Sequence, residues 1–201
     1  MLKKILIVSV IGSSSLMSPI AIADTSDSGF YLTASVGTGL ETDIDGSIDG
    51  IDVSATGRTK FSGSLGLGYD FAENNWRVEA GVFRSLSETD TITVDGSKYD
   101  VDENGTATGL SLAVAYDFEN DSKITPFIGG SIERIWAEDV DASTSYGVDF
   151  GLSTPISDNM DFWGAIGLGI STEETNDIDG SSVKTDGGTA WGFSTGLRIR
   201  L

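Results

Sequence analysis

The sequence contains no cysteine and no histidine, and it has only three prolines among 201 residues. Without cysteine the chain has no disulfide framework, and without either residue it lacks the usual ligands of a zinc site. Catalytic schemes in which histidine acts as a general base are excluded as well. Bases are also scarce, with 12 Lys and Arg against 31 Asp and Glu, which argues against nucleic acid as a partner.

The first 23 residues have the features of a secretory signal peptide. Lysines at positions 3 and 4 are followed by an apolar run over 5–16 that is too short to span a bilayer, and AIA at 21–23 matches a small-residue cleavage site. We therefore expect residues 1–23 to be removed and residues 24–201 to form a single domain.

Beyond residue 24 the dominant pattern is alternation with a period of two, which predicts β-strands rather than helices. In segment 106–118, large apolar residues occupy one face, and glycine, serine and alanine occupy much of the other. Eight segments of this kind occur, at 29–40, 58–71, from Trp76 onward, 106–118, 124–136, 144–154, 160–170 and 189–201.

The connections between these segments alternate in length. Those at 72–75, 119–123 and 155–159 are short, whereas three of the other four (41–57, 85–105, 137–143 and 173–188) are long. This alternation is typical of outer-membrane barrels. Small residues on the less apolar face suit the crowded interior of an eight-stranded barrel, so we expect the apolar face to meet lipid. A soluble barrel or sandwich is the alternative, but its second face would usually be rich in charged residues.

Aromatic residues gather near both ends of the predicted strands. This placement predicts two belts at the two membrane interfaces. The belt at the short-turn rim would contain Trp76, Phe127 and Phe162, and the belt at the long-loop rim would contain Trp136, Tyr146 and Trp191.

Four features together resemble the small outer-membrane barrels of the opacity and OmpA/OmpX type. They are the export signal, the repeated YDF at 69–71 and 116–118, the segment TPFIGGSIERIW at 125–136, and the closing FSTGLRIRL at 193–201. The resemblance implies an all-β fold, an eight-stranded antiparallel up-and-down transmembrane β-barrel with short periplasmic turns and longer acidic extracellular loops.

The same resemblance implies a location and partners. The location is the bacterial outer membrane, and the partners are outer-membrane lipid, lipopolysaccharide and the barrel-assembly machinery, which reads the C-terminal strand. The family usually ends in an aromatic residue, whereas this chain ends in Leu201.

Nine charged residues fall on the face predicted to line the lumen. Isolated charges in a low-dielectric interior are costly, so we expect these groups to form an ion-pair network that closes the barrel. The members are Asp70, Arg77, Glu79, Asp117, Glu133, Asp149, Asp161, Arg198 and Arg200. The alternative is a narrow, cation-preferring pore lined by the acids. By the same parity, Arg84 and Arg134 project to the lipid side.

A tetrad (Ile/Val)-Asp-(Gly/Ala)-Ser occurs once in each of the four longer connections, at 44–47, 94–97, 140–143 and 178–181. Asp-Gly between β-rich flanks is a strong hairpin signal, so these tetrads are predicted to be tips of strands that continue past the bilayer. Closure of the barrel between its first and last strands should place 43–47 beside 177–181.

The four connections are strongly acidic, with 19 acidic and two basic residues. Carboxylate oxygens suit Ca²⁺, but the segment from 43 to 49 breaks the EF-hand pattern. We therefore expect weak, diffuse attraction of divalent cations rather than a specific metal site. The residues concerned are Asp43, Asp45, Asp49, Asp177 and Asp179.

These observations favour a non-enzymatic surface barrel with a role in the envelope or in surface contacts. Barrel enzymes of the related kinds usually rely on histidine, which this chain lacks. No cofactor is expected.

Overall fold

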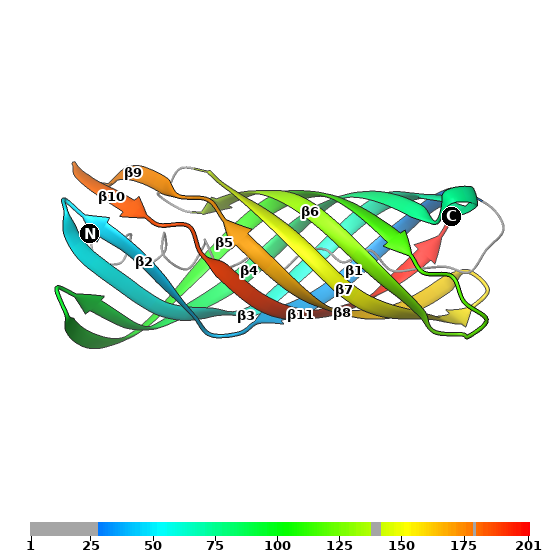
Figure 1. Ribbon diagram of the computed structural model, residues 1–201, viewed down its shortest axis with the longest axis horizontal. Coiled ribbons are helices and arrows are strands. Elements are labelled where there is room, and N and C mark those ends of the chain that lie inside the picture. Colours follow the sequence, from blue (N-terminus) through cyan, green and yellow to red (C-terminus); the bar gives the residue numbers. More distant parts are fainter. Residues whose placement is uncertain (1–27, 138–141, 179) are drawn as a thin grey trace.

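The computed structural model describes residues 28–137, 142–178 and 180–201, and in this part eleven strands form one antiparallel sheet. Pairing of β1 with both β3 and β11 closes the sheet into a ring, so the predicted eight-stranded antiparallel barrel is confirmed (Figure 1). The strands of the ring are β1 (Gly29–Gly39), β3 (Ile51–Phe71), β4 (Trp76–Val94), β5 (Ser97–Asp117), β6 (Thr125–Ala137), β7 (Ser143–Ser157), β8 (Met160–Ser171) and β11 (Thr189–Arg200). None of the helices in the described residues is long and apolar enough to cross a membrane.

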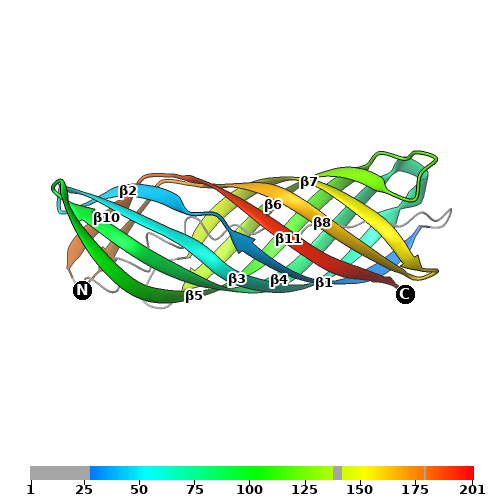
Figure 2. The ribbon, with the colours of Figure 1, turned by 90° about the horizontal axis from the view of Figure 1, so that it is seen from below.

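The two ends of the barrel differ, as Figures 1 and 2 show. At one end the strands join through short connections, including the 3-10 turn η1 (Ala72–Asn74) between β3 and β4, and the C-terminus lies there. At the other end β3, β4 and β5, with 21, 19 and 21 residues, run on as a long hairpin sheet. Only about 9–11 residues are needed to cross a bilayer, so these strands extend well past it. We call the two ends the short-turn end and the long-loop end.

Three further strands lengthen the long-loop end. They are β2 (Thr42–Ile48), β9 (Glu174–Ile178) and β10 (Ser181–Thr185). β2 pairs with β3, and β10 pairs with both β2 and β9. The predicted neighbourhood of the first and last long connections is therefore present, and much of their length is hairpin rather than loop.

Two tetrads form hairpin tips as predicted. Val94 pairs with Ser97 across a two-residue turn in which Asp95 and Gly96 have φ of 48° and 75°. Positive φ at both central residues is the signature of a type I′ turn. Ile178 pairs with Ser181 in the same way, although Asp179 lies outside the described residues.

The tetrad at 44–47 is not a tip, and this part of the prediction is wrong. It lies inside β2, and the chain turns instead at Asp49 and Gly50, whose φ values are 49° and 84°. Gly46 faces the Lys184 carbonyl of β10 so closely that a Cβ would not fit. Glycine there serves the packing of two strands and not a turn. Most of the tetrad at 140–143 lies outside the described residues.

The outer wall of the barrel is apolar and its lumen is small and polar. Leu65 and Leu112, for example, are 63% and 62% exposed, although they are large hydrophobic residues. Buried positions are instead rich in serine, threonine and charged residues. This distribution inverts that of a soluble barrel and matches a wall that meets lipid.

Four large aromatic side chains fill the lumen, and each lies over a glycine directly opposite on the next strand. A glycine leaves room for the ring, and the ring covers the glycine backbone. The pairs are Tyr31 with Gly68, Phe83 with Gly109, Phe127 with Gly151, and Trp163 with Gly196.

Phe127 corrects one expectation from the sequence. The sequence predicts it in the aromatic belt at the short-turn rim, but it is 2% exposed inside the barrel. Successive side chains of a strand point to opposite faces, and its neighbour Ile128 belongs to the outward set. The alternation of β6 therefore places Phe127 in the lumen.

Candidate functional site

Most of the ion-paired groups of the lumen lie at the short-turn end, where strand ends bring them together. Arg77 is the second residue of β4, and Asp117 is the last residue of β5. Arg77 donates from Nε to Asp117 Oδ2 at 2.8 Å and from Nη2 to Oδ1 at 2.5 Å. Both residues are buried, and the Arg77 guanidinium lies 5.7 Å from the centroid of the Phe127 ring. This two-point geometry is the strongest that an arginine makes with a carboxylate.

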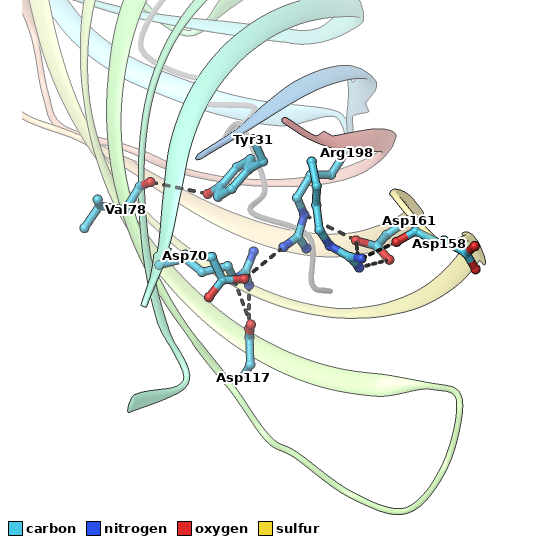
Figure 3. A network of polar contacts seen from close by, with 9 residues as sticks. Tyr31, Asp70, Val78, Asp117, Asp158, Asp161 and Arg198 are labelled. Carbon is cyan, nitrogen blue, oxygen red and sulfur yellow. Dashed lines mark hydrogen bonds and ion pairs between the residues drawn. The ribbon is translucent and has the colours of Figure 1, made fainter. Parts of the chain in front are cut away.

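Arg198 of β11 occupies the centre of the network (Figure 3). Its Nη1 lies 3.7 Å from Asp70 Oδ2 of β3, and its Nε lies 3.7 Å from Asp161 Oδ2 of β8. These distances are those of ion pairs and not of hydrogen bonds. The guanidinium also stacks 5.0 Å from the ring centroid of Tyr31. One fully buried cation thus links three strands.

Arg200 completes the group from the rim. It donates from Nη2 to Asp161 at 3.0 Å and from Nη1 to the backbone carbonyl of Asp158 at 2.7 Å. Tyr31 donates its hydroxyl to the Val78 carbonyl at 3.3 Å, which fixes the ring beneath Arg198 (Figure 3). Three arginines and three aspartates therefore form a charge-balanced cluster, which we call the luminal plug, with members Asp70, Arg77, Asp117, Asp161, Arg198 and Arg200.

The other three predicted members are luminal but lie outside the ion pairs. Glu79 accepts a hydrogen bond from Thr33 at 2.9 Å, while both oxygens of Glu133 and Oδ1 of Asp149 lack a partner among the described residues. These acids stand further from the short turns than the arginines do. Arg134, the base nearest to Glu133 in the sequence, points outward. Among the described residues, six of the nine predicted charges therefore take part in ion pairs.

Several uncharged side chains that the sequence analysis did not assign to the lumen pack around the plug. Tyr31, Phe127 and Trp163 are 1%, 2% and 0% exposed, and Phe127 and Trp163 pack together. The signal was present in the alternation, because Tyr31 stands between outward Phe30 and Leu32. Trp163 likewise follows outward Phe162.

Two of the five acids predicted to attract cations take part in hairpin contacts. The Asp43 carboxylate accepts a hydrogen bond from Thr56 at 2.5 Å, and the Asp49 carboxylate accepts one from the Ser182 amide at 2.9 Å. Asp45 lies on β2 and Asp177 on β9, while Asp179 is not described. Within the described ranges, no three acidic side chains converge as a metal site would require.

Comparison with known proteins identifies the family. Residues 7–141 match the family model described as outer membrane protein beta-barrel domain. The chain belongs to this family. No curated protein sequence matches it. The family places the protein in the bacterial outer membrane, as the sequence predicted.

Solved structures of small outer-membrane barrels share the fold at low sequence identity. Neisserial surface protein A (NspA) is 19% identical with a TM-score of 0.56, and the match covers 88% of this chain and 100% of that one. OprG from Pseudomonas aeruginosa is 14% identical with a TM-score of 0.61, covering 86% and 96%. AlkL, solved in lipid bilayers, is 12% identical with a TM-score of 0.53, covering 92% and 97%. At these identities the likeness concerns the fold alone.

Proposed function

We propose that this protein is a non-enzymatic structural barrel of the outer-membrane surface whose lumen is closed to ions. The observation that carries the proposal is the luminal plug. The side chains of Arg77, Arg198 and Asp161 are fully buried in it, and Arg77 forms a bidentate pair with Asp117. The absence of histidine from the sequence supports a non-enzymatic role.

The plug opposes conduction for two physical reasons. An eight-stranded barrel has an interior that side chains just fill, so little bore remains. An ion passing the short-turn end would also have to separate charges that are paired in a low-dielectric setting. Removing one partner of such a pair leaves an uncompensated buried charge and costs about 3–5 kcal/mol.

Planar-bilayer recording tests the closed lumen. Purified wild-type protein should give no reproducible conductance. The double variant R77S/D117S should conduct, because it removes the plug side chains that β4 and β5 contribute. The outward-facing variant R84S is the matched control and should stay silent. A steady cation-selective conductance from the wild type would overturn the closed barrel in favour of the pore.

A narrow cation-preferring pore is the second candidate, and one observation favours it. Glu79, Glu133 and Asp149 are buried luminal acids, and each has at least one carboxylate oxygen that accepts no hydrogen bond among the described residues. If the wild type conducts, E133Q/D149N should lower the preference for cations over anions. Unchanged selectivity in that variant would exclude these acids as the selective groups.

We further propose that the long-loop end faces the cell exterior, because outer-membrane barrels usually have their short turns in the periplasm and their longer loops outside the cell. In this orientation the acidic hairpins attract divalent cations diffusely, and β11 presents the C-terminal strand to the assembly machinery. The cysteine-free sequence makes labelling simple. A membrane-impermeant maleimide should label G96C on intact cells but K123C only after lysis. The reverse pattern would overturn the orientation.

A further inference from the structure

The outer wall carries a cluster of basic residues on one side of the barrel. Among the described residues, six other Lys and Arg side chains belong to the luminal plug, a hairpin or a short turn. The wall cluster is different, because its four members are exposed on β3, β4 and β6. They are Arg58, Lys60, Arg84 and Arg134.

Strand register brings Arg84 and Arg134 close to each other across β5. Arg84 pairs with Thr108, and Arg134 pairs with Leu110, so the two arginines flank consecutive outward positions of β5. Arg134 donates to the Thr144 hydroxyl at 2.7 Å. Neither guanidinium forms an ion pair with a carboxylate in the part of the chain that the structure describes.

A β-bulge adds the third cation. The register of β3 and β4 shifts between Thr59 and Phe61, so Lys60 and Phe61 both face outward. Lys60 and Arg58 share Glu88, at 2.6 Å and 3.1 Å. Glu88 is the acid with which the cluster forms ion pairs in the described part of the chain, so four positive charges there face one paired negative charge.

The patch lies at the level where lipid phosphates are expected. Strands rise about 3.3 Å per residue and tilt by about 40°, so Arg84, eight positions after Trp76, stands about 20 Å from the short-turn aromatics. The apolar band of such barrels is about 25 Å tall. Trp136 pairs with Thr108, which also pairs with Arg84, so Trp136 and Arg84 lie in one row across the sheet. An aromatic residue is expected at this interfacial level.

Two apolar grooves run along the wall beside the arginines. One has a volume of about 660 Å³ and is lined by Leu65, Val82 and Trp136, with Arg84 at its edge. The other, of about 400 Å³, is lined by Leu112 and Ile132, with Arg134 at its edge. Each groove therefore combines an apolar surface with a cation.

We propose that this wall binds the lipid A part of lipopolysaccharide. Arg84 and Arg134, assisted by Lys60 and Arg58, would hold its two phosphates, and its acyl chains would lie in the two grooves. Guanidinium groups bind phosphate through paired hydrogen bonds. Cations spread from β3 to β6 fit a headgroup with two separated phosphates better than a glycerophospholipid with one.

This inference rests on the proposed orientation, because lipopolysaccharide occupies the outer leaflet. The two ideas can still fail separately. Binding of lipid A to the purified barrel in detergent does not depend on how the protein sits in a cell, whereas maleimide labelling of intact cells reports orientation alone.

The test is titration of folded barrel in detergent micelles with purified bisphosphorylated lipid A. R84Q/R134Q should bind about tenfold more weakly than the wild type, because two charge-assisted phosphate contacts are lost. The matched control K98Q/K123Q, which removes the same charge at the two ends of the barrel, should bind within about twofold of the wild type. Heat-dependent gel mobility verifies that every variant is folded.

Two more arms define the ligand. R84K/R134K is a conservative variant that keeps both positive charges but lacks the planar, paired donors of the guanidinium. It should bind with an affinity between those of the wild type and R84Q/R134Q. Lipid A without phosphates should bind the wild type weakly. Its affinity should not exceed the affinity of R84Q/R134Q for bisphosphorylated lipid A. Equal affinity of R84Q/R134Q and wild type would overturn the site. Binding of phosphatidylglycerol as tight as that of lipid A would overturn its assignment to lipopolysaccharide.

Discussion

Replacing Arg77 with methionine should destabilise the barrel more than any single change on its outer wall. Methionine keeps much of the volume but removes both hydrogen bonds to Asp117 and the contact with the Phe127 ring. Asp117 is 5% exposed, so its carboxylate would remain buried without the cation that it contacts directly. The loss of one partner from such a pair costs about 3–5 kcal/mol of unfolding free energy.

The measurement is reversible urea unfolding in detergent micelles, followed by tryptophan fluorescence. With a urea dependence of about 2 kcal/mol per molar, a loss of 4 kcal/mol lowers the midpoint by about 2 M. The wall variant R84M removes an exposed arginine without a carboxylate partner and should change stability by less than about 0.5 kcal/mol.

The double variant R77M/D117L separates the pair from the rest of the plug. Because neither charge remains buried, its cost should be smaller than the sum of the single costs by about 2–3 kcal/mol. A loss under about 1 kcal/mol for R77M, or strict additivity in the cycle, would refute the view that this pair is a coupled part of the plug.

Three further outcomes are expected. G151A should lower the thermal midpoint of the gel-mobility shift, with a loss of about 1–3 kcal/mol, because its Cβ would displace Phe127, whereas G164A, whose Cβ would meet the Ser194 carbonyl at an ordinary 3.8 Å, should not; equal midpoints would contradict the aromatic-over-glycine packing. Hydrogen bonds from Lys60 and Arg58 hold the pKa of the Glu88 carboxyl below its usual 4.5, so these contacts are complete above pH 4.5 and are lost as the pH falls through the lower folded value; a carboxyl NMR titration midpoint at or above 4.5 would disagree. Calorimetric titration with Ca²⁺ at low salt should show no saturable heat, since the Asp43 and Asp49 carboxylates already accept hydrogen bonds, and a saturating isotherm would require a specific site.

Much of the fold could be predicted from the sequence because the side-chain alternation of a strand is local. Large residues on one face and glycine or serine on the other fixed which side of each strand meets lipid, and the structure agrees at Leu65 and Leu112. The eight alternating segments gave the strand count, and the alternating lengths of the connections gave the two unlike ends. The same parity placed all nine predicted charges in the lumen.

Two predictions from the sequence were wrong. One placed Phe127 against the in-out alternation of its strand, and the other placed a turn inside a strand. Phe127 was assigned to a rim because it begins a strand, although its neighbour Ile128 faces outward. The tetrad at 44–47 looks like a turn, but the same letters lie inside β2, and the type I′ turn follows at Asp49 and Gly50. A close approach by β10 explains Gly46, and no local pattern reports that approach.

By itself the sequence determined the barrel, its unlike ends and the inward set of charges, because each follows from alternation along single strands. Only the tertiary structure decided which of those charges meet. Pairing across a barrel depends on the register of every strand pair around the ring, and this is how Arg198 of β11 reaches Asp70 of β3 and Asp161 of β8. The same register leaves carboxylate oxygens of Glu133 and Asp149 without a hydrogen bond among the described residues and gathers Arg84 and Arg134 on one stretch of the wall.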